Sequence, residues 1–258
     1  MALAIITGAS SGIGREFALK MKEMGLADEF WLIARGEEKL RETALQLSCP
    51  VKIISADLST EMGINVYKKA LEEEKPKVSF LVNAAGFGVF GAFDVLDDSI
   101  AAGMIDLNVK ATVLITHNTV PHMVKGGRII QLGSGSCFTP LPHFNVYAAS
   151  KSFVLHYTKA LCYELKPYGV KATCFCPGWV GTAFLGKSKS NTGAMVPKKF
   201  SPVLKVDKVV RGCLKASIKG RRMYVVGLYT KFQHLMFKLL PDRLLSFLWC
   251  KMLKKSEG

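Results

Sequence analysis

Tyr147 and Lys151 have the residue types and spacing that most directly suggest chemistry, in the segment Tyr147-Ala148-Ala149-Ser150-Lys151. Residues four apart share one face of a helix. A phenol with an ordinary pKa of ~10 is a weak acid–base group at neutral pH, but a neighbouring ammonium favours the phenolate and lowers that pKa. The pair therefore predicts proton exchange with a carbonyl or alcohol oxygen. Helices contain such pairs by chance, so the prediction depends on the residues that accompany them.

Two polar residues upstream fit the same chemistry. Ser134 follows an apolar, strand-like run, and its hydroxyl could hold the substrate oxygen that Tyr147 protonates. Asn108 lies within a helical pattern between Leu107 and Val109, although asparagine is a poor residue for a helix interior. Two interpretations of Asn108 stay open. It is either a structural amide that supports the adjacent strand, or a water-holding member of a proton relay to Lys151.

A glycine-rich turn at Thr7–Gly14 follows the first apolar run and precedes a helical pattern. Gly8 lets the chain turn sharply, Gly12 lets the backbone approach a pyrophosphate, and Gly14 permits close contact between helix and strand. The N–H groups at the start of the helix then face the phosphates. The placement between a strand and a helix predicts a dinucleotide site formed by Gly8, Ser10, Ser11, Gly12, Ile13 and Gly14.

The end of the second predicted strand indicates which dinucleotide is bound. An acidic residue there would bind the ribose 2′-hydroxyl of NAD(H), but this sequence has Ala34 followed by Arg35. A guanidinium matches phosphate geometry, so Arg35 favours the 2′-phosphate of NADP(H). The alternative, in which Arg35 is a surface residue and Glu37 or Glu38 reaches the ribose of NAD(H), stays open.

Alternating strand and helix patterns must position these residues. Apolar runs predict strands at Leu3–Thr7, Phe30–Ala34, Val51–Ser55, Phe80–Asn83, Arg128–Leu132, Lys171–Cys176 and Met223–Val226. This alternation predicts an α/β fold, a Rossmann-type doubly wound parallel sheet of seven strands flanked by helices. We expect residues 1–227 to form the catalytic domain and 228–258 a basic, amphipathic helical extension packed on it. The polar segment Lys187–Val203 is expected to be a mobile loop with room for one short helix.

Taken in chain order, the glycine turn, Asn108, Ser134, Tyr147 and Lys151 resemble the motifs of the short-chain dehydrogenase/reductase family. The resemblance covers residues 3 to about 227 and is to the hydroxysteroid dehydrogenase and 3-ketoacyl reductase-like members in particular. The resemblance implies Tyr147 as acid–base, Ser134 as orienter of the substrate oxygen, Lys151 as ribose ligand and modulator of the Tyr147 pKa, and Asn108 as relay residue. Catalysis without a metal is also implied. Further cofactor contacts implied by the resemblance are Asp57, Leu58, Asn83, Ala84, Gly86, Pro177, Gly178, Val180 and Thr182.

Aromatic residues dominate the positions expected to line a substrate cleft, which suits a bulky apolar ketone or alcohol. The candidates, together with Ser134, are Phe87, Phe90, Phe138, His143, Phe144, Trp179 and Phe184. About half of these rings are expected to belong to the core instead.

The predicted activity is NADP(H)-dependent interconversion of a secondary alcohol and a ketone on a hydroxysteroid- or bile-acid-like substrate. Reduction of a 3-oxoacyl chain and a non-catalytic, NADPH-binding regulatory role are the alternatives.

Charge is distributed unevenly along the chain. Residues 1–186 contain 18 Lys/Arg and 17 Asp/Glu, whereas residues 187–258 contain 17 and 3. The tail Tyr229–Leu253 has apolar residues at helical spacing, and a lid, a subunit interface or a membrane-surface contact all stay open for it. The basic tail lacks interleaved RNA-binding motifs, so nucleic acid is not expected as a partner.

The chain has seven cysteines and no CxxC pair, which indicates reduced thiols in a cytoplasmic protein. Peripheral contact with a membrane stays open. The family resemblance implies a homodimer or homotetramer.

Overall fold

A seven-stranded parallel sheet forms the centre of the computed structural model, which describes residues 1–189 and 194–255. The strands follow the order β3-β2-β1-β4-β5-β6-β8. Their bounds are β1 Leu3–Thr7, β2 Glu29–Ala34, β3 Val51–Ser55, β4 Val78–Asn83, β5 Met123–Leu132, β6 Lys171–Cys176 and β8 Met223–Val225. All seven predicted strands are present, so the predicted doubly wound α/β fold is confirmed.

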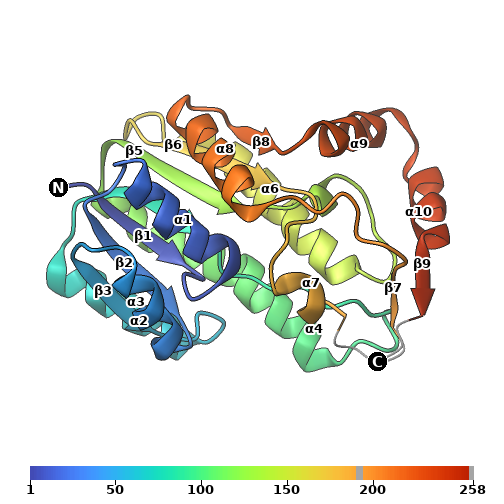
Figure 1. Ribbon diagram of the computed structural model, residues 1–258, viewed down its shortest axis with the longest axis horizontal. Helices are drawn as coiled ribbons and strands as arrows, with labels where there is room; N and C mark the ends of the chain where they lie inside the picture. The colour runs from blue at the N-terminus through green and yellow to red at the C-terminus, as the bar shows by residue number, and fades with distance from the viewer. Residues whose placement is uncertain (190–193, 256–258) are drawn as a thin grey trace.

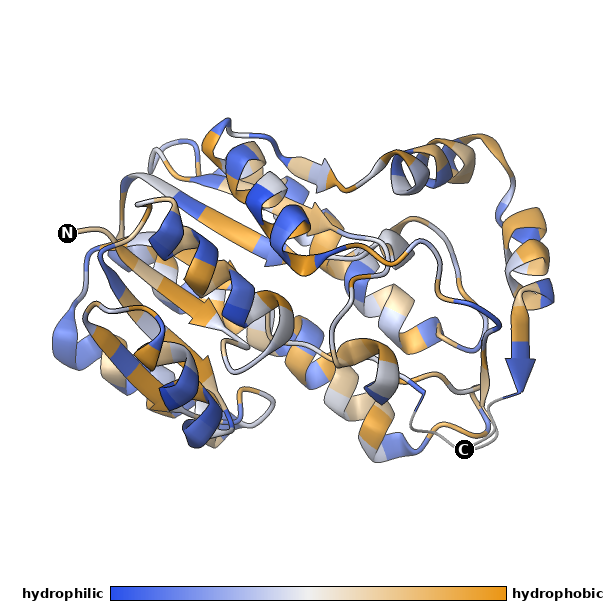
Figure 2. Cartoon of the chain, in the orientation of Figure 1, coloured by the Kyte–Doolittle hydropathy of each residue, from blue (hydrophilic) through white to orange (hydrophobic). Residues whose placement is uncertain are grey.

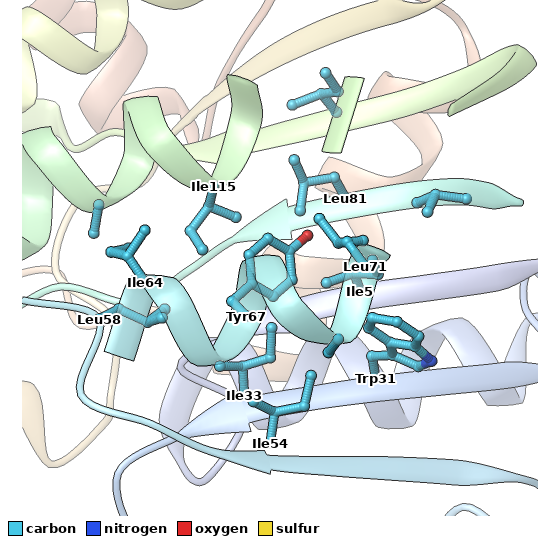
Figure 3. Packing of buried hydrophobic residues seen from close by; sticks show 14 of the residues in the cluster. Ile5, Trp31, Ile33, Ile54, Leu58, Ile64, Tyr67, Leu71, Leu81 and Ile115 are labelled. Atoms are coloured by element: carbon cyan, nitrogen blue, oxygen red, sulfur yellow. The ribbon is translucent and has the colours of Figure 1, made fainter. Parts of the chain in front are cut away.

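Helices cover both faces of the sheet (Figure 1). One face packs against α1, α2 and α8, and the other against α3, α5 and α6. Figure 3 shows Tyr67 of α3 among apolar side chains of the second face. The helix bounds are α1 Gly12–Glu23, α2 Glu37–Leu45, α3 Glu61–Glu74, α4 Asp98–Ile105, α5 Thr112–Thr119, α6 Asn145–Glu164, α7 Phe184–Lys187, α8 Val206–Ile218, α9 Leu228–Leu239 and α10 Asp242–Lys251.

The strand order reverses between β1 and β4, because the chain first builds the sheet outward through β2 and β3 and then returns to the other side of β1. In parallel sheets of this kind, the crevice at the carboxyl ends of the two strands that flank such a switch is where ligands bind. The glycine turn follows β1 and the segment Ala84–Gly86 follows β4, so both lie at this crevice.

Residues 98–122 form a continuous helical segment made of α4, the π-helical turn η1 (Asp106–Ala111), α5 and the 3-10 turn η2 (Val120–His122). Within the described ranges, this segment is the one helix long and apolar enough, by length and composition alone, to cross a membrane. It contacts α6 and α3 and contributes Ala111 and Ile115 to the core. We therefore interpret it as a helix of the folded body.

The segment Lys187–Val203 contains regular structure that the sequence did not predict. Met195–Pro197 form β7, which pairs antiparallel with β9 at the end of the chain (Leu253–Lys255). A strand of three residues has too short a pattern to be recognised from its sequence, and its partner lies more than fifty residues away. Residues 190–193 of the predicted loop lie outside the described residues.

Candidate active site

The turn between β1 and α1 has the geometry expected of a phosphate-binding loop. Gly8 adopts φ +69°, and a Cβ there would lie 2.9 Å from the backbone of Ala85, so a larger residue would separate β1 from the end of β4. Helix α1 then begins at Gly12 with no acidic residue in its first turn and no side-chain cap from Ser11. Its first N–H groups and the positive end of the helix dipole thus lie at the crevice, where they can receive an anion.

Ala84 and Thr182, two of the predicted cofactor contacts, lie beside this loop. The Thr7 hydroxyl accepts hydrogen bonds from the backbone N–H groups of Ala84 and Ala85, both at 3.1 Å, which joins the two strand ends. Thr182 lies close to Gly12, since a Cβ added to Gly12 would be 3.5 Å from the Thr182 Cβ. Thr182, at the end of the segment Pro177–Thr182, therefore lies against the glycine turn.

Asn83 lies at the end of β4, but its side chain is turned toward the interior. Its Nδ2 donates to the Thr116 hydroxyl of α5 at 2.9 Å, and the residue is buried. The side-chain amide therefore ties the end of β4 to helix α5. Any contact of this residue with a bound nucleotide would therefore involve its backbone.

Arg35 extends from the end of β2 and is 77% exposed. Its guanidinium lies 3.7 Å from Asp57, which also accepts hydrogen bonds from the backbone N–H and hydroxyl of Ser59. Burial raises the pKa of the Asp57 carboxyl, but the Ser59 hydrogen bonds and the Arg35 charge outweigh it, so the pKa lies below its ordinary value. Asp57 is thus held as an anion beside a guanidinium that has most of its surface free.

Tyr147, Lys151 and Ser134 come together at the carboxyl end of β5. Helix α6 places Tyr147 and Lys151 one turn apart, with the Lys151 Nζ 5.7 Å from the centre of the Tyr147 ring. Ser134 caps the turn η3 (Gly135–Phe138) by accepting from the Ser136 N–H, and it also forms a hydrogen bond with the Tyr147 phenol. The three residues that the sequence selected are therefore neighbours in space.

Burial shifts both titratable groups of this cluster toward their neutral forms. It raises the pKa of Tyr147 above its ordinary value of 10.0, and the hydrogen bond with Ser134 only partly offsets the rise. It lowers the pKa of Lys151 from 10.5 to about 8. The sequence predicted a lowered phenol pKa. The direction differs because water is excluded from the phenol, and because the Lys151 Nζ donates to the Leu132 carbonyl at 2.8 Å.

Asn108 is fully buried in the π-helical turn, and its side-chain amide is bonded within the protein. Its Oδ1 accepts from the Phe87 N–H at 3.0 Å, while its Nδ2 donates to the Phe87 carbonyl at 2.9 Å and to the Ser150 hydroxyl at 3.0 Å. Both amide protons are used. Of the two interpretations that the sequence left open, the side-chain geometry matches the structural one, in which Asn108 fixes the segment after β4 against α6.

The aromatic residues predicted to line a cleft divide into two groups. Phe90 and Phe144 are 0% and 1% exposed and stack on each other at 3.9 Å, and Phe144 stacks on Tyr147 at 4.4 Å. Phe144 therefore packs directly against the Tyr147 ring, and Phe90 packs behind Phe144. Because both rings are buried, neither lines the substrate cleft, and the prediction that they do is wrong. A Cβ on Gly88 would lie 2.4 Å from the Tyr147 ring, so backbone also packs closely against it.

The remaining candidates are partly exposed: Phe87, Phe138, His143, Trp179 and Phe184. Phe184 of α7 lies 5.5 Å from Tyr147, and Trp179 lies 4.6 Å from Phe200. Sequence reasoning missed Phe200 because it lies in an irregular polar segment. It also missed Trp249 of α10, whose Nε1 donates to the Pro142 carbonyl at 2.8 Å. A tryptophan within a basic helix was the signal that could have identified it.

The sheet order, the glycine turn and the buried Ser–Tyr–Lys cluster together define a nucleotide-binding α/β protein of the Rossmann type. The chain belongs to the short chain dehydrogenase family, whose family model matches residues 2–193.

Similar proteins agree with this assignment. An uncharacterized oxidoreductase of Staphylococcus epidermidis is 36% identical over 182 residues, which are 70% of this chain and 78% of that protein. The human inactive hydroxysteroid dehydrogenase-like protein 1 is 34% identical over 196 residues, 72% of this chain and 58% of that protein. A short-chain dehydrogenase from Sphingobium yanoikuyae, solved in complex with NADPH, is 25% identical with a TM-score of 0.77, and the match covers 95% and 96% of the two chains.

Proposed function

We propose that this protein is an NADP(H)-dependent oxidoreductase that interconverts a secondary alcohol and a ketone on a bulky, hydrophobic substrate of the hydroxysteroid type. The observation that carries the proposal is the convergence of Ser134, Tyr147 and Lys151 at the crevice beside the glycine turn. Ser134 and Tyr147 share a hydrogen bond there, so one substrate oxygen can contact both hydroxyls.

Residues around the crevice fit a nicotinamide dinucleotide, since the free end of α1 suits a pyrophosphate and the exposed guanidinium of Arg35 suits a 2′-phosphate. When bound, the nucleotide supplies or accepts a hydride. The residues that would hold it are those of the glycine turn, Arg35, Asp57, Leu58, the stretch 83–86 and the stretch 177–182, with Tyr147 and Lys151 at the nicotinamide end. The solved relative with NADPH supports this choice of nucleotide.

The protein's own groups would handle the proton and the orientation of the substrate. Ser134 holds the substrate oxygen, and Tyr147 passes its phenolic proton to that oxygen during reduction and takes it back during oxidation. Lys151 supplies positive charge beside the phenol. Asn108 acts as a positioning residue, because it ties Phe87 to the helix that carries Tyr147 and Lys151.

Two partly exposed aromatic rings support the bulky, apolar substrate: Phe184, which contacts the Tyr147 ring, and Trp179, which packs against the same apolar cluster. The hydroxysteroid dehydrogenase-like name of one relative supports it as well. A 3-oxoacyl chain is the alternative substrate. We further propose a cytoplasmic homo-oligomer in which residues 1–227 carry the site and the tail from residue 228 packs on the same domain.

A second candidate function is a non-catalytic, nucleotide-binding regulatory role. It is favoured by one specific observation, which is that the human relative is described as inactive. The intact Ser134, Tyr147 and Lys151 set of this chain favours catalysis instead.

Replacing Tyr147 with phenylalanine separates the two candidates. We expect Tyr147→Phe to lower ketone reduction by about 10²–10⁴-fold while NADPH binding, followed by fluorescence, stays unchanged. Tyr168→Phe is the matched control, because Tyr168 is exposed and lies in the turn after α6, away from Tyr147 at its start. Loss of NADPH absorbance with steroid and acyl ketones measures the rate. The enzymatic proposal would be refuted if the wild type turned over none of a broad panel of ketones, or if Tyr147→Phe kept the full rate.

A further inference from the structure

Helices α9 and α10 form an arm beyond the carboxyl side of the sheet (Figure 1). The inner side of the arm is attached to the body. The His234 ring of α9 packs at a tilt against Phe138 with 3.9 Å between ring centres, Trp249 of α10 donates to the Pro142 carbonyl, and β9 pairs with β7. The arm is therefore seated against the body through one face, and its other face is directed away from the protein.

The outer face of α9 is apolar. Leu228, Phe232, Leu235 and Leu239 are 86%, 60%, 52% and 69% exposed. Their spacing of four, three and four residues keeps all four side chains within about 60° of one another around the helix. Helix α10 and the residue that follows it continue the pattern with four large apolar side chains that are each at least 40% exposed: Leu244, Phe247, Leu248 and Met252. Figure 2 shows these hydrophobic positions alternating with hydrophilic ones along both helices.

Positive charge borders this apolar face. Residues 228–255 contain six Lys/Arg and a single acidic residue, Asp242. At helical spacing, Lys231 and Lys238 lie side by side along one edge of the α9 stripe. Throughout the described ranges, no carboxylate lies within ion-pair distance of Lys231, Lys238 or Arg243. The arm thus combines exposed apolar side chains with Lys231, Lys238 and Arg243, whose charges no carboxylate of the described residues pairs with.

These features discriminate between the possible occupants of the face. In a two-fold contact between copies, the same patch meets itself, so the lysines of one arm would face those of the other with one acidic residue per chain to compensate. An anionic phospholipid surface satisfies both features at once. Its acyl region accepts Phe and Leu side chains to a depth of about 5–10 Å, while flanking lysines reach its phosphates.

We propose that α9 and α10 form a docking surface for an anionic phospholipid bilayer, which holds the protein at the membrane surface through Phe232, Leu235 and the flanking Lys231 and Lys238. Residues 1–186 are close to neutral, with 18 basic and 17 acidic residues, so the positive excess of the chain lies in residues 187–258, which include the arm. The proposal is independent of the reaction that the protein catalyses.

Cosedimentation of the full chain with vesicles tests the proposal. We expect strong binding to vesicles of phosphatidylcholine and phosphatidylglycerol in equal parts, weak binding to phosphatidylcholine alone, and release as salt screens the charges. The double variant Phe232→Ser/Leu235→Ser should weaken binding at least about 10-fold, since it removes two apolar side chains from the bilayer. Lys231→Glu/Lys238→Glu should weaken binding by a similar factor, and only to anionic vesicles.

Matched controls use exposed residues of α2 and α3, on the opposite side of the molecule (Figure 1). Leu45→Ser/Met62→Ser and Lys39→Glu/Lys69→Glu remove the same kinds of side chain and should leave vesicle binding unchanged. Circular dichroism confirms that each variant is folded. Equal binding to neutral and anionic vesicles, or arm variants that bind as the wild type does, would overturn the proposal. So would a wild type that self-associates through the arm and ignores vesicles. Because the readout is sedimentation, its failure would leave the proposed enzymatic activity untouched.

Discussion

The buried ammonium of Lys151 makes the stability of this protein depend on pH in a way that one substitution can isolate. Burial lowers the pKa of Lys151 from 10.5 to about 8. The folded state therefore binds fewer protons than the unfolded state between these two values, so this group makes unfolding more difficult as pH rises. Conversely, the cost of burying the charged form grows as pH falls from about 10.5 to about 8.

The size of the effect follows from the shift. At about 1.4 kcal/mol per pKa unit, the ammonium costs the folded state about 3 kcal/mol at neutral pH, and linkage predicts that about 1 kcal/mol of this cost disappears between about pH 7 and about pH 9. Lys151→Met removes the charge but also leaves the Leu132 carbonyl without its donor, which costs about 1–3 kcal/mol at every pH. The two effects nearly cancel in a single measurement, so only the pH dependence is diagnostic.

Urea unfolding of the wild type and of Lys151→Met at several pH values measures this pH dependence. We expect the free energy of unfolding of the wild type, relative to Lys151→Met, to rise by about 1 kcal/mol from about pH 7 to about pH 9 with an unchanged slope in urea. Lys69→Met, an exposed lysine on α3, should show no such rise. A difference between wild type and Lys151→Met that stays constant with pH would show that Lys151 keeps an ordinary pKa, and the electrostatic description of the site would be wrong.

Two further substitutions test the site directly. Arg35→Asp replaces a guanidinium with a carboxylate that repels the 2′-phosphate, so we expect the KM for NADPH to rise at least about 10-fold relative to that for NADH; an unchanged preference would remove Arg35 from the nucleotide site. Gly88→Ala adds a Cβ that would lie 2.4 Å from the Tyr147 ring, so the ring must move and kcat/KM should fall about 10–100-fold in a steady-state assay. Gly186→Ala, which meets no atom within 4 Å, is its control, and equal effects of the two would contradict the packing argument.

The strands and the glycine turn were predictable because their signals are local. β1 is buried at every position, so its residues must form a continuous apolar run, and the turn that follows needs glycine at Gly8 to pass Ala85. The same holds for Tyr147 and Lys151, which helical spacing alone places on one face. Local sequence therefore determined both the sheet and the central pair of the site.

The aromatic packing around Tyr147, the role of the Asn108 side chain and the pairing of β7 with β9 depended on contacts between distant segments. Nothing near Phe90 in the sequence indicates that it stacks on Phe144, more than fifty residues later, and so lies under Tyr147. The structural role of the Asn108 side chain likewise depends on Phe87 and Ser150, which other segments contribute. The pairing of β7 with β9 has the same origin. Patterns within one segment cannot specify which residues of another segment will meet them.

The burial of this site also sets the protonation states of Tyr147 and Lys151. A phenol whose pKa is raised stays protonated at neutral pH, so Tyr147 is in the form that can donate a proton, as the proposed reduction of a ketone requires. A lysine whose pKa lies near 8 still carries charge in most molecules at neutral pH. The stacked rings of Phe90 and Phe144 pack against the Tyr147 side of the site, so this apolar contact contributes to the burial that keeps the phenol protonated.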